Sequence, residues 1–378
     1  MNLDLTEEQE MLRTSARDFL TKECPKALVR KLEEDEKGFS PDMWRKMADL
    51  GWMGLVLPEK YGGQGMGFMD LIILLQEMGR NIVPGPFFCT VVLGSLPILN
   101  AGSEEQKNEF LPKIAKGELI MTLAFTEPSA RYDAAGVHTK AETHGDTFVI
   151  NGTKLFVENA HIANYIICAT RTRKGDTPED GITLFIVDAK SQGIKCEVMP
   201  TIGADKLCEV VFDNVKVPKN NMLGKLHGGW HILSKVLEQA TIAKCAEMVG
   251  GEEAAMEMTL AYVKERVQYG KPIGSFQVIQ HYCANMWMNV ETSRDILYKA
   301  AWSVAEGLPT SDTEVAVAKG WINEAYKFVT ERALQCHGAI GTTRDHDIGL
   351  YYRRAKSGEL AFGDTDFYKE VVAQKLGL

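Results

Sequence analysis

The chain lacks the long hydrophobic run from which a membrane-spanning helix is built. Such a helix needs about 18 consecutive apolar residues, and no run of that length occurs. The apolar stripe from Leu71 to Leu75 is short and predicts the buried part of a helix in a globular protein. We therefore expect no membrane span.

An excess of basic charge is also missing. The chain has 42 Lys and Arg residues against 51 Asp and Glu residues, which gives a formal net charge of -9. A protein whose main role is to bind nucleic acid usually carries the opposite balance. The composition therefore argues against nucleic-acid binding, and it still allows a local basic pocket for a phosphorylated ligand.

The eight cysteines, at positions 24, 89, 168, 196, 208, 245, 283 and 336, show no CxxC spacing. Scattered cysteines of this kind predict reduced core residues of a cytosolic protein. The chain opens with Met1-Asn2-Leu3-Asp4 and shows neither a signal peptide nor an Arg-rich presequence. These features predict a bacterial cytoplasmic location, although a mitochondrial protein with a trimmed presequence would look the same.

Several well-known catalytic signatures are absent. There is no GxxxxGK[ST] phosphate loop, no HExxH zinc motif, no GxSxG nucleophile elbow and no GxGxxG after a strand. His161, His231 and His281 have no partners at metal-ligand spacing. Each is therefore predicted to be an ordinary surface or core histidine, and no metal site is expected.

What the chain does contain is the composition of a folded protein, with 45% hydrophobic and 25% charged residues. Its 378 residues exceed one ordinary core, so two or three domains are expected. Residues 1–118 show helical spacing, with a capping box at Thr6 to Gln9 and helices expected at 70–79 and 103–114. These residues are predicted to form an N-terminal helical domain.

Residues 119–226 show short β-rich runs in place of helical spacing. Two runs flank Asn151-Gly152, a dipeptide that favours a type I′ hairpin turn. The β-rich runs lie at 146–150, 153–157, 165–172, 182–188, 194–199 and 208–217. No helix-length segment separates them, so they predict an antiparallel sheet and not a βαβ arrangement.

Residues 227–378 return to helical spacing, with long helices expected at 230–267, 276–306 and 312–335. Long helices near the C-terminus predict a helical bundle. The order is helical, then β, then helical. The predicted fold class is therefore α+β, with an N-terminal helical domain, a central antiparallel β-domain and a C-terminal bundle.

Three segments carry more polar residues and glycine than packing requires. The loop Thr126 to Asp133 either binds a ring or a phosphate or is an ordinary turn. The segment Arg266 to Lys271, with Gln277 after it, suits a diphosphate, but basic residues at a helix C-terminus also favour the helix dipole. The segment Gln335 to Gly341 either approaches a ligand closely or caps a helix.

Taken in order, these segments resemble the acyl-CoA dehydrogenase family of flavoproteins, and the resemblance runs through essentially the whole chain. The best-matching segments are Leu123 to Pro128, Ile150 to Lys154, Arg266 to Gly270, Gln277, and Gln335 to Gly341. Their order and spacing are far more specific than any one of them.

The resemblance implies a C-terminal four-helix domain, FAD bound between the β-domain and that domain, and a homotetramer built from two dimers. It implies an oxidoreductase acting on the CH–CH group of an acyl-CoA thioester. A carboxylate removes the α-proton while the β-hydride passes to flavin N5, and a flavin ribityl hydroxyl and a backbone amide polarise the thioester carbonyl. Electrons then leave through electron-transfer flavoprotein.

The same resemblance assigns cofactor-binding residues. Phe125 and Thr126 are expected to contact the isoalloxazine, and Phe156 to stack where the family usually has Trp. The residues expected to reach the FAD of the partner subunit are Arg266, Tyr269, Gln277, Gln335 and Gly338.

The chain departs from the family pattern at the catalytic base. The usual glutamate precedes a Gly-Thr pair, and an ungapped alignment puts Phe362 at that position, followed by Gly363 and Asp364. Some family members carry the base on the first helix of the C-terminal domain, where this chain has Ala240. Neither position holds a carboxylate, so the identity of the base stays open.

Two carboxylates are candidate catalytic replacements. Asp364 either reaches the substrate from a shifted loop or caps the loop through backbone contacts. Glu247 shares a helical face with Ala240 and Lys244. Lys244 and Glu247 therefore either put charge on the acyl cavity or form an ion pair turned toward solvent.

Further departures lie on the cofactor and substrate sides. Glu158 replaces a threonine that usually hydrogen-bonds near flavin N5, and a carboxylate there disfavours reduced anionic flavin unless it is protonated or turned away. Arg131 and Tyr132 replace the Gly-Ser that usually follows the Thr-Glu-Pro motif, and they are expected to serve the CoA substrate through guanidinium or hydroxyl. Lys244 and Phe362 are expected on the acyl side of the substrate site.

Three hypotheses follow. The first is an FAD-dependent acyl-CoA dehydrogenase with an atypical base and a specialised acyl group, for which an alicyclic thioester is the preferred candidate. The second keeps the fold and flavin but changes the chemistry, for example to a reductase or a carrier-protein-linked enzyme. The third is a non-catalytic or half-site subunit of a heteromeric acyl-CoA dehydrogenase.

Overall fold

The computed structural model describes residues 4–378, so Met1 to Leu3, on which the expected lack of a leader partly rests, lie outside it. The chain forms two compact units. Among the described residues, unit 1 comprises residues 4–31, Gly67–Val83 and Thr241–Leu378, and unit 2 comprises Leu32–Met66 and Pro84–Ala240. The three-domain division with boundaries after residues 118 and 226 stays a prediction.

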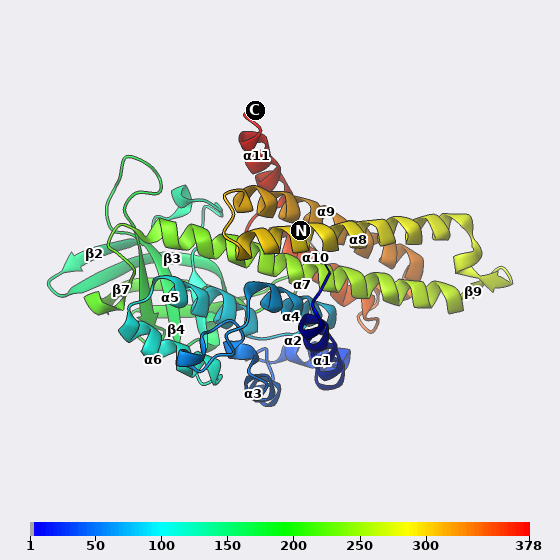
Figure 1. The fold of residues 1–378 in the computed structure, drawn as a ribbon, viewed down its shortest axis with the longest axis horizontal. Helices are drawn as coiled ribbons and strands as arrows, with labels where there is room; N and C mark the ends of the chain where they lie inside the picture. The colour runs from blue at the N-terminus through cyan, green and yellow to red at the C-terminus, as the bar shows by residue number, and fades with distance from the viewer. Residues whose placement is uncertain (1–3) are drawn as a thin grey trace. The chain divides into compact units, whose positions relative to one another are not determined.

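Unit 2 is built on an eight-stranded sheet with the order β6-β7-β3-β2-β4-β5-β8, and β1 pairs with β4. Figure 1 shows β2, β3, β4 and β7 of this sheet. The strands are β1 Met121–Ala124, β2 Lys140–His144, β3 Thr147–Glu158, β4 Tyr165–Arg171, β5 Ile182–Asp188, β6 Ile194–Met199, β7 Leu207–Pro218 and β8 Met222–Leu223. All pairs are antiparallel except β1 with β4 and β2 with β4. The predicted sheet domain is confirmed, and the runs expected at β4 to β7 match the strands within a residue.

The hairpin turn expected at Asn151-Gly152 is wrong. β3 runs straight through both residues, and its register with β7 shifts there. A Cβ on Gly152 would lie 2.5 Å from Thr139 Oγ1, so glycine at this position allows close passage of a neighbouring segment. The turn joins β2 to β3 at Gly145, which has a φ of 61°.

The core of the sheet domain lies on one face of β3 and β7. Its members include Phe148, Val157, Phe185 and Val210, which are all at most 3% exposed. The rings of Phe148 and Phe185 lie 4.7 Å apart. Burial of these large apolar side chains stabilises the sheet because it removes apolar surface from water.

Most helices of unit 2 precede β1 in the sequence, and the first part of α7 Gly229–Glu265 follows β8. They include α3 Pro41–Asp49, a π-helix at Cys89–Ser95, α5 Leu96–Ala101 and α6 Glu104–Ala115. A capping box between Ser103 and Gln106 starts α6, as the polar residues there predict. The π-helix is buried throughout, and no sequence pattern indicated it.

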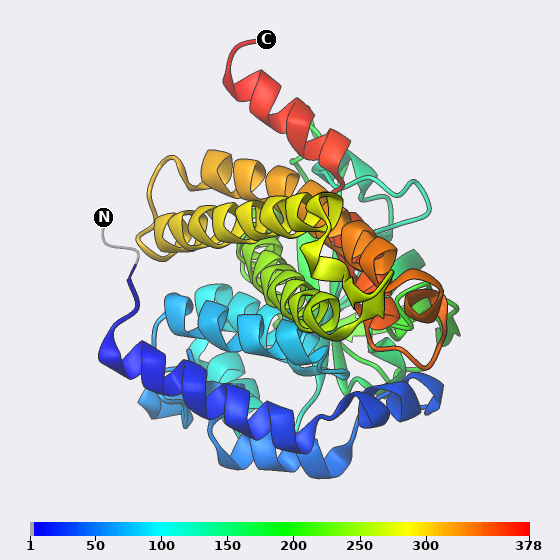
Figure 2. The same cartoon turned by 90° about the vertical axis from the view of Figure 1, so that its right-hand side faces the viewer.

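Unit 1 is helical. Its elements are α1 Glu7–Glu23, most of α2 Lys26–Glu34, α4 Phe68–Asn81, residues 241–265 of α7 Gly229–Glu265, β9 Val267–Gln268, β10 Lys271–Pro272, α8 Gln277–Ala305, α9 Ser311–His337, α10 Ile348–Leu360 and α11 Thr365–Lys375. Figure 2 shows α8 and α9 running side by side, and α10 and α11 also pack on α9. The predicted helical bundle is confirmed, with helix ends within about two residues of those expected.

Local sequence explains where these helices start and how they pack. The predicted capping box at Thr6 and Gln9 is present, and it starts α1. The stripe from Leu71 to Leu75 on α4 is fully buried, as predicted. Among residues 4–378, no helix is long and apolar enough to cross a membrane.

Two glycines allow α4 and α7 to cross in backbone contact. A Cβ on Gly79 of α4 would lie 1.9 Å from the carbonyl oxygen of Glu247. A Cβ on Gly250 of α7 would lie 1.8 Å from the carbonyl oxygen of Gln76. Any larger residue would force the helices apart, so the crossing depends on both glycines.

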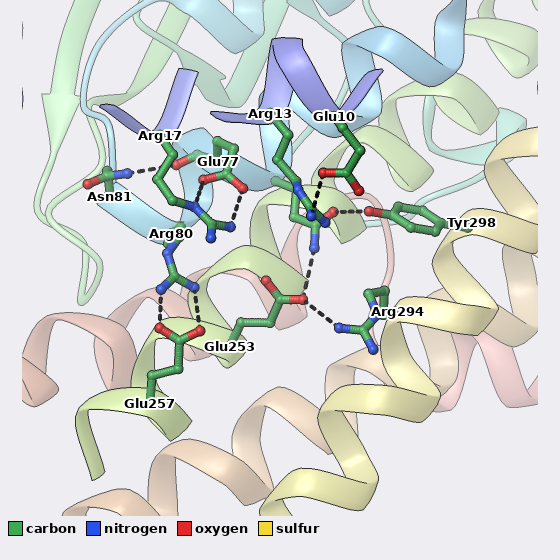
Figure 3. Close-up of polar contacts among 11 residues, drawn as sticks. Glu10, Arg13, Arg17, Glu77, Arg80, Asn81, Glu253, Glu257, Arg294 and Tyr298 are labelled. Atoms are coloured by element: carbon green, nitrogen blue, oxygen red, sulfur yellow. Dashed lines mark hydrogen bonds and ion pairs between the residues drawn. The ribbon is translucent and has the colours of Figure 1, made fainter. Parts of the chain in front are cut away.

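Hydrogen bonds and an ion pair of polar side chains connect α1, α4, α7 and α8 (Figure 3). Arg17 of α1 binds Glu77 of α4 through two hydrogen bonds of 2.9 and 2.6 Å, and the Glu77 side chain is only 1% exposed. Gln76 donates to Glu253 at 3.0 Å and accepts from the hydroxyl of Tyr298 at 2.8 Å. These contacts fix the positions of α1, α4, α7 and α8 within unit 1.

Candidate functional site

β1 leads directly into the segment that carries Phe125 and Thr126. The ring of Phe125 is buried and lies 6.3 Å from that of Trp230. The Phe125 carbonyl accepts a hydrogen bond of 3.1 Å from Lys154 Nζ. The Thr126 carbonyl accepts one of 2.9 Å from the backbone N–H of Leu155. β3 therefore fixes the backbone of both expected flavin contacts.

A buried ion pair holds the loop that follows. Lys154 is fully buried, Glu127 is 5% exposed, and Lys154 Nζ lies 2.7 Å from Glu127 Oε1. The same carboxylate accepts the backbone N–H groups of His138 and Thr139 at 3.0 and 2.9 Å. Burial raises the pKa of Glu127, but the Lys154 charge and the hydrogen bonds from Lys154 and Thr139 together outweigh it, and the net shift is downward. Glu127 is thus an ionised anchor of the loop.

β3 also carries Phe156 and Glu158. Phe156 lies at a register shift between Lys154 and Val157, has a φ of 56° and is 46% exposed. Its ring is therefore open to a planar ligand. The Glu158 carbonyl accepts a hydrogen bond of 2.7 Å from Thr122 Oγ1 of β1. The structure thus brings the expected flavin contacts at the ends of β1 and β3 together.

Arg131 and Tyr132 lie in a surface loop of unit 2. The Arg131 side chain is 54% exposed and binds Asp133 of the same loop, with Nε 2.9 Å from Oδ1. The hydrogen bond from Arg131 lowers the pKa of Asp133. Arg131 is therefore accessible and Tyr132 is half-buried, and the Arg131 guanidinium is shared with its own loop.

In unit 1, Lys244 and Glu247 form the ion pair that their spacing predicts. Lys244 Nζ lies 2.7 Å from Glu247 Oε2. Every residue from 241 to 253 is buried except these two, whose side chains are 15% and 23% exposed. Neither side chain is turned fully to solvent. Within residues 241–253 of α7, these two side chains are the least buried.

The loop at the usual base position is held from two sides. Phe362 adopts a left-handed φ of 59°, and its carbonyl accepts a hydrogen bond of 2.8 Å from the hydroxyl of Tyr368. That hydroxyl also lies 3.1 Å from Thr241 Oγ1 of α7. The position of Phe362 is thus set by contacts from α7 and α11.

Lys319 of α9 holds the other side of this loop. It is fully buried, and burial lowers its pKa to about 8. Its Nζ donates to Asn323 Oδ1 at 2.5 Å, Gly358 O at 2.8 Å, Glu359 O at 3.2 Å and Gly363 O at 3.1 Å. The ammonium therefore binds the last carbonyls of α10 and the loop in one arrangement.

Asp364 is the N-cap of α11. Its Oδ1 accepts the backbone N–H of Phe367 at 2.8 Å. A cap of this kind stabilises a helix start by about 1 kcal/mol. The structure thus realises the capping role that the sequence left open for Asp364.

The residues expected to reach the FAD of a partner subunit are all exposed. They are Arg266, Tyr269, Gln277, Gln335 and Gly338. Tyr269 is 92% exposed, and a Cβ on Gly338 would meet no atom within 4 Å. These surfaces leave room for a ligand to approach backbone and side chains closely.

The residues present fit FAD. In unit 2, the exposed aromatic ring of Phe156 and the fixed backbone of Thr126 suit a planar ring system. In unit 1, the open space at Gly338 suits close approach of a ligand from another subunit. Glu158 is the one expected contact whose charge is unusual for such a ligand.

Sequence reasoning missed the buried lysines and Tyr368. Apart from Asn323, which is four residues from Lys319, the partners of Lys154 and Lys319 lie 27 to 44 residues away in the chain. No local pattern marks such a pair. The one available signal was a lysine inside an otherwise apolar stretch, which buries its charge only when partners are present.

Comparisons with known proteins cover the whole chain. Family models described as acyl-CoA dehydrogenase N-terminal, middle and C-terminal domains match residues 6–118, 122–215 and 227–377. "Probable acyl-CoA dehydrogenase YngJ" of Bacillus subtilis is 34% identical over 100% of both chains. The Caffeyl-CoA reductase-Etf complex subunit CarC of Acetobacterium woodii is 30% identical over 98% of both chains. Butyryl-CoA dehydrogenase of Megasphaera elsdenii superposes with a TM-score of 0.92 at 31% identity, over 100% of both chains.

Proposed function

Because the chain belongs to the acyl-CoA dehydrogenase family, whose members are FAD-dependent oxidoreductases acting on CH–CH groups of acyl-CoA thioesters, we propose that it desaturates a compact acyl-CoA with Glu247 as its base. The observation that carries this proposal is the Lys244–Glu247 pair, whose side chains, 15% and 23% exposed, are the least buried of residues 241–253. A general base must meet its proton at hydrogen-bond distance, so it needs access of this kind.

The alternative base, Asp364, is less well placed. Its Oδ1 accepts the N–H of Phe367, and Lys319 and Tyr368 hold the loop around it. To turn toward a substrate it would have to give up the helix cap. We therefore assign Asp364 to holding α11 and Glu247 to the proton.

FAD, when bound, supplies the hydride acceptor. Phe125, Thr126 and Phe156 would hold the isoalloxazine, and Arg266, Gln277 and Gly338 would hold the FAD of a partner subunit. In this chain Glu247 would take the α-proton, and Lys244, at 2.7 Å, would keep its carboxylate ionised and oriented. Arg131 and Tyr132 would bind the CoA portion from their surface loop.

A compact acyl group, alicyclic in our proposal, fits the surroundings of Glu247. The backbone of α4 at Gly79 approaches Glu247 so closely that not even a methyl group fits between the helices. A long straight chain therefore has no path in that direction. A ring ends within a shorter distance of the thioester, so it avoids the crossing.

Exposed apolar side chains support assembly of several copies. On α8 and α9 the exposed large apolar residues are Val278 at 54%, Trp287 at 52%, Met288 at 63%, Trp302 at 36%, Val317 at 40% and Trp321 at 41%. Such residues are typical of interaction surfaces. We propose a homotetramer, and electron-transfer flavoprotein as the electron acceptor, since one relative is a subunit of an Etf complex.

A second candidate function rests on the missing base. Phe362 and Ala240 occupy both usual positions of the catalytic carboxylate. A non-catalytic subunit that pairs with an active homologue would tolerate this loss. So would a flavin enzyme with altered chemistry, such as a reductase.

The test is the flavin half-reaction of Glu247→Gln and Asp364→Asn proteins. Each amide keeps the size of the side chain and removes its basicity. We expect E247Q to slow flavin reduction by about 100-fold or more, as loss of a general base does, and D364N to retain it. E324Q, in a surface pair with Lys369 at 2.6 Å, is the matched control.

If the flavin of the E247Q protein is reduced at the wild-type rate, the assignment of Glu247 as the base is refuted. Loss in D364N alone would move the role to Asp364. A wild-type protein that binds no flavin and copurifies with a homologue would favour the non-catalytic subunit.

A further inference from the structure

Three side chains lie at the β6 edge of the unit 2 sheet, beside the end of β3. They are Cys196 of β6, Cys208 of β7 and His161 just after β3. Cys208 pairs with Val157, between the assigned flavin contacts Phe156 and Glu158. We propose that Cys196 and Cys208 are a redox modification site, which a peroxide closes into a disulfide and a thiol reductant reopens.

Strand register places both thiols on one face. β6 is the edge strand and pairs only with β7, with Cys196 opposite Val210 and Val198 opposite Cys208. Residues two apart on a strand share a face, so Cys196 and Cys208 are diagonal neighbours. Because β6 is bound on one side only, it can shift toward the geometry that a disulfide requires.

His161 completes the group. Its Nδ1 lies 3.7 Å from Cys208 Sγ. Its Nε2 is buried and has no hydrogen-bond partner among residues 4–378. The hydrogen bonds from Cys196 and His161 lower the pKa of Cys208, whereas the same contact raises the pKa of Cys196. The lowered pKa makes Cys208 the better nucleophile of the two, because a thiolate is the form that attacks an oxidised sulfur.

Exposure determines which thiol an oxidant meets first. Cys196 is the one exposed cysteine of the eight, and Cys208 is fully buried. Five of the other six are buried, and Cys283 is half-buried. The expected order is therefore oxidation at Cys196 followed by attack from Cys208.

The chemistry balances with peroxide as the oxidant. Peroxide oxidises the Cys196 thiol to a sulfenic acid and releases one water. The Cys208 thiolate then attacks the Cys196 sulfur, the S–O bond breaks, and the hydroxyl leaves as a second water with a proton that His161 can supply. In total the two thiols lose two protons and two electrons, and one molecule of peroxide gains them to form two molecules of water.

The test treats the purified full-length protein with hydrogen peroxide and follows its intact mass and its free-thiol count. We expect a loss of two hydrogens and two thiols, a linked peptide pair containing Cys196 and Cys208, and full recovery with dithiothreitol. C196S removes only an exposed thiol and should abolish the change without loss of fold. H161N should form the same disulfide more slowly.

Cys283 and Cys336 provide an internal control. They lie on α8 and α9 near one another, and burial raises the pKa of both. The thiol that His161 contacts is that of Cys208, so C283S should leave the reaction unchanged. The proposal is overturned if Cys196 is oxidised alone while Cys208 stays a free thiol, if C196S still forms a disulfide, or if all eight thiols survive.

Discussion

Replacing Lys154 with methionine removes the buried charge that anchors the flavin-side loop. Lys154 is fully buried, and its Nζ contacts Glu127 Oε1 at 2.7 Å and the Phe125 carbonyl at 3.1 Å. Methionine keeps most of the volume and cannot donate a hydrogen bond. The Glu127 carboxylate would then stay buried without its counter-charge.

The expected loss of stability depends on the hydrogen bonds that Glu127 retains after Lys154 is replaced. Breaking a buried ion pair by removing one partner typically costs about 3–5 kcal/mol. Glu127 retains the N–H groups of His138 and Thr139, which partly satisfy its oxygens. We therefore expect about 3 kcal/mol of lost stability. A domain holds roughly 5–15 kcal/mol, so the protein should fold and bind FAD more weakly.

The assay is urea unfolding followed by circular dichroism, together with FAD retention on ultrafiltration. Lys154→Met combined with Glu127→Gln should be more stable than the sum of the single changes, because the neutral amide no longer needs a counter-charge. The coupling should be about 2 kcal/mol. If Lys154→Met alone costs under about 0.5 kcal/mol, the pair does not hold the loop and the reasoning fails.

Further substitutions test other contacts. Lys319→Met should speed amide hydrogen exchange at residues 358–363 and slow the flavin half-reaction, whereas Lys369→Met should alter neither; unchanged exchange would refute the positioning role. The pKa of Glu127 is lowered on folding, so its contribution to stability is present above the usual carboxyl pKa, about 4.3, and is lost as the pH falls through the lower folded value. Urea titrations across that window should therefore show a shallower loss for Glu127→Gln. Gly79→Ala should lower the free energy of unfolding by about 1–3 kcal/mol, because its Cβ would lie 1.9 Å from a carbonyl oxygen. Gly320→Ala, whose Cβ would lie 3.6 Å from its nearest neighbour, should raise it by about 0.5–1 kcal/mol, because alanine favours the helical conformation of α9. Thermal melts measure both changes.

Local signals predicted most of the fold. The capping boxes at Thr6 and Ser103 set helix starts, and period-two and helical spacing set the strands and long helices. The Asn151-Gly152 turn failed because the dipeptide preference is weak against the pairing of β3 with both neighbours. Residue 152 is glycine because Thr139 passes close to its backbone. The sequence alone does not show that the segment containing Thr139 lies there.

The site was less accessible to prediction. The spacing of Lys244 and Glu247 predicted their pairing because both lie on one helix. The roles of Lys319 and Lys154 depend on carbonyls and a carboxylate from other segments, which only tertiary structure brings together. For Asp364, sequence offered two roles, and the geometry of one backbone N–H favours the cap.

Anaerobic flavin bleaching of the purified protein tests the central claim most directly. Straight, branched and alicyclic acyl-CoA thioesters would be mixed with the oxidised holoenzyme and the loss of flavin absorbance followed. The account predicts fast bleaching by a compact alicyclic thioester, slower bleaching by long straight chains, and strong slowing in the Glu247→Gln protein. No bleaching by any thioester, with flavin fully bound, would contradict it.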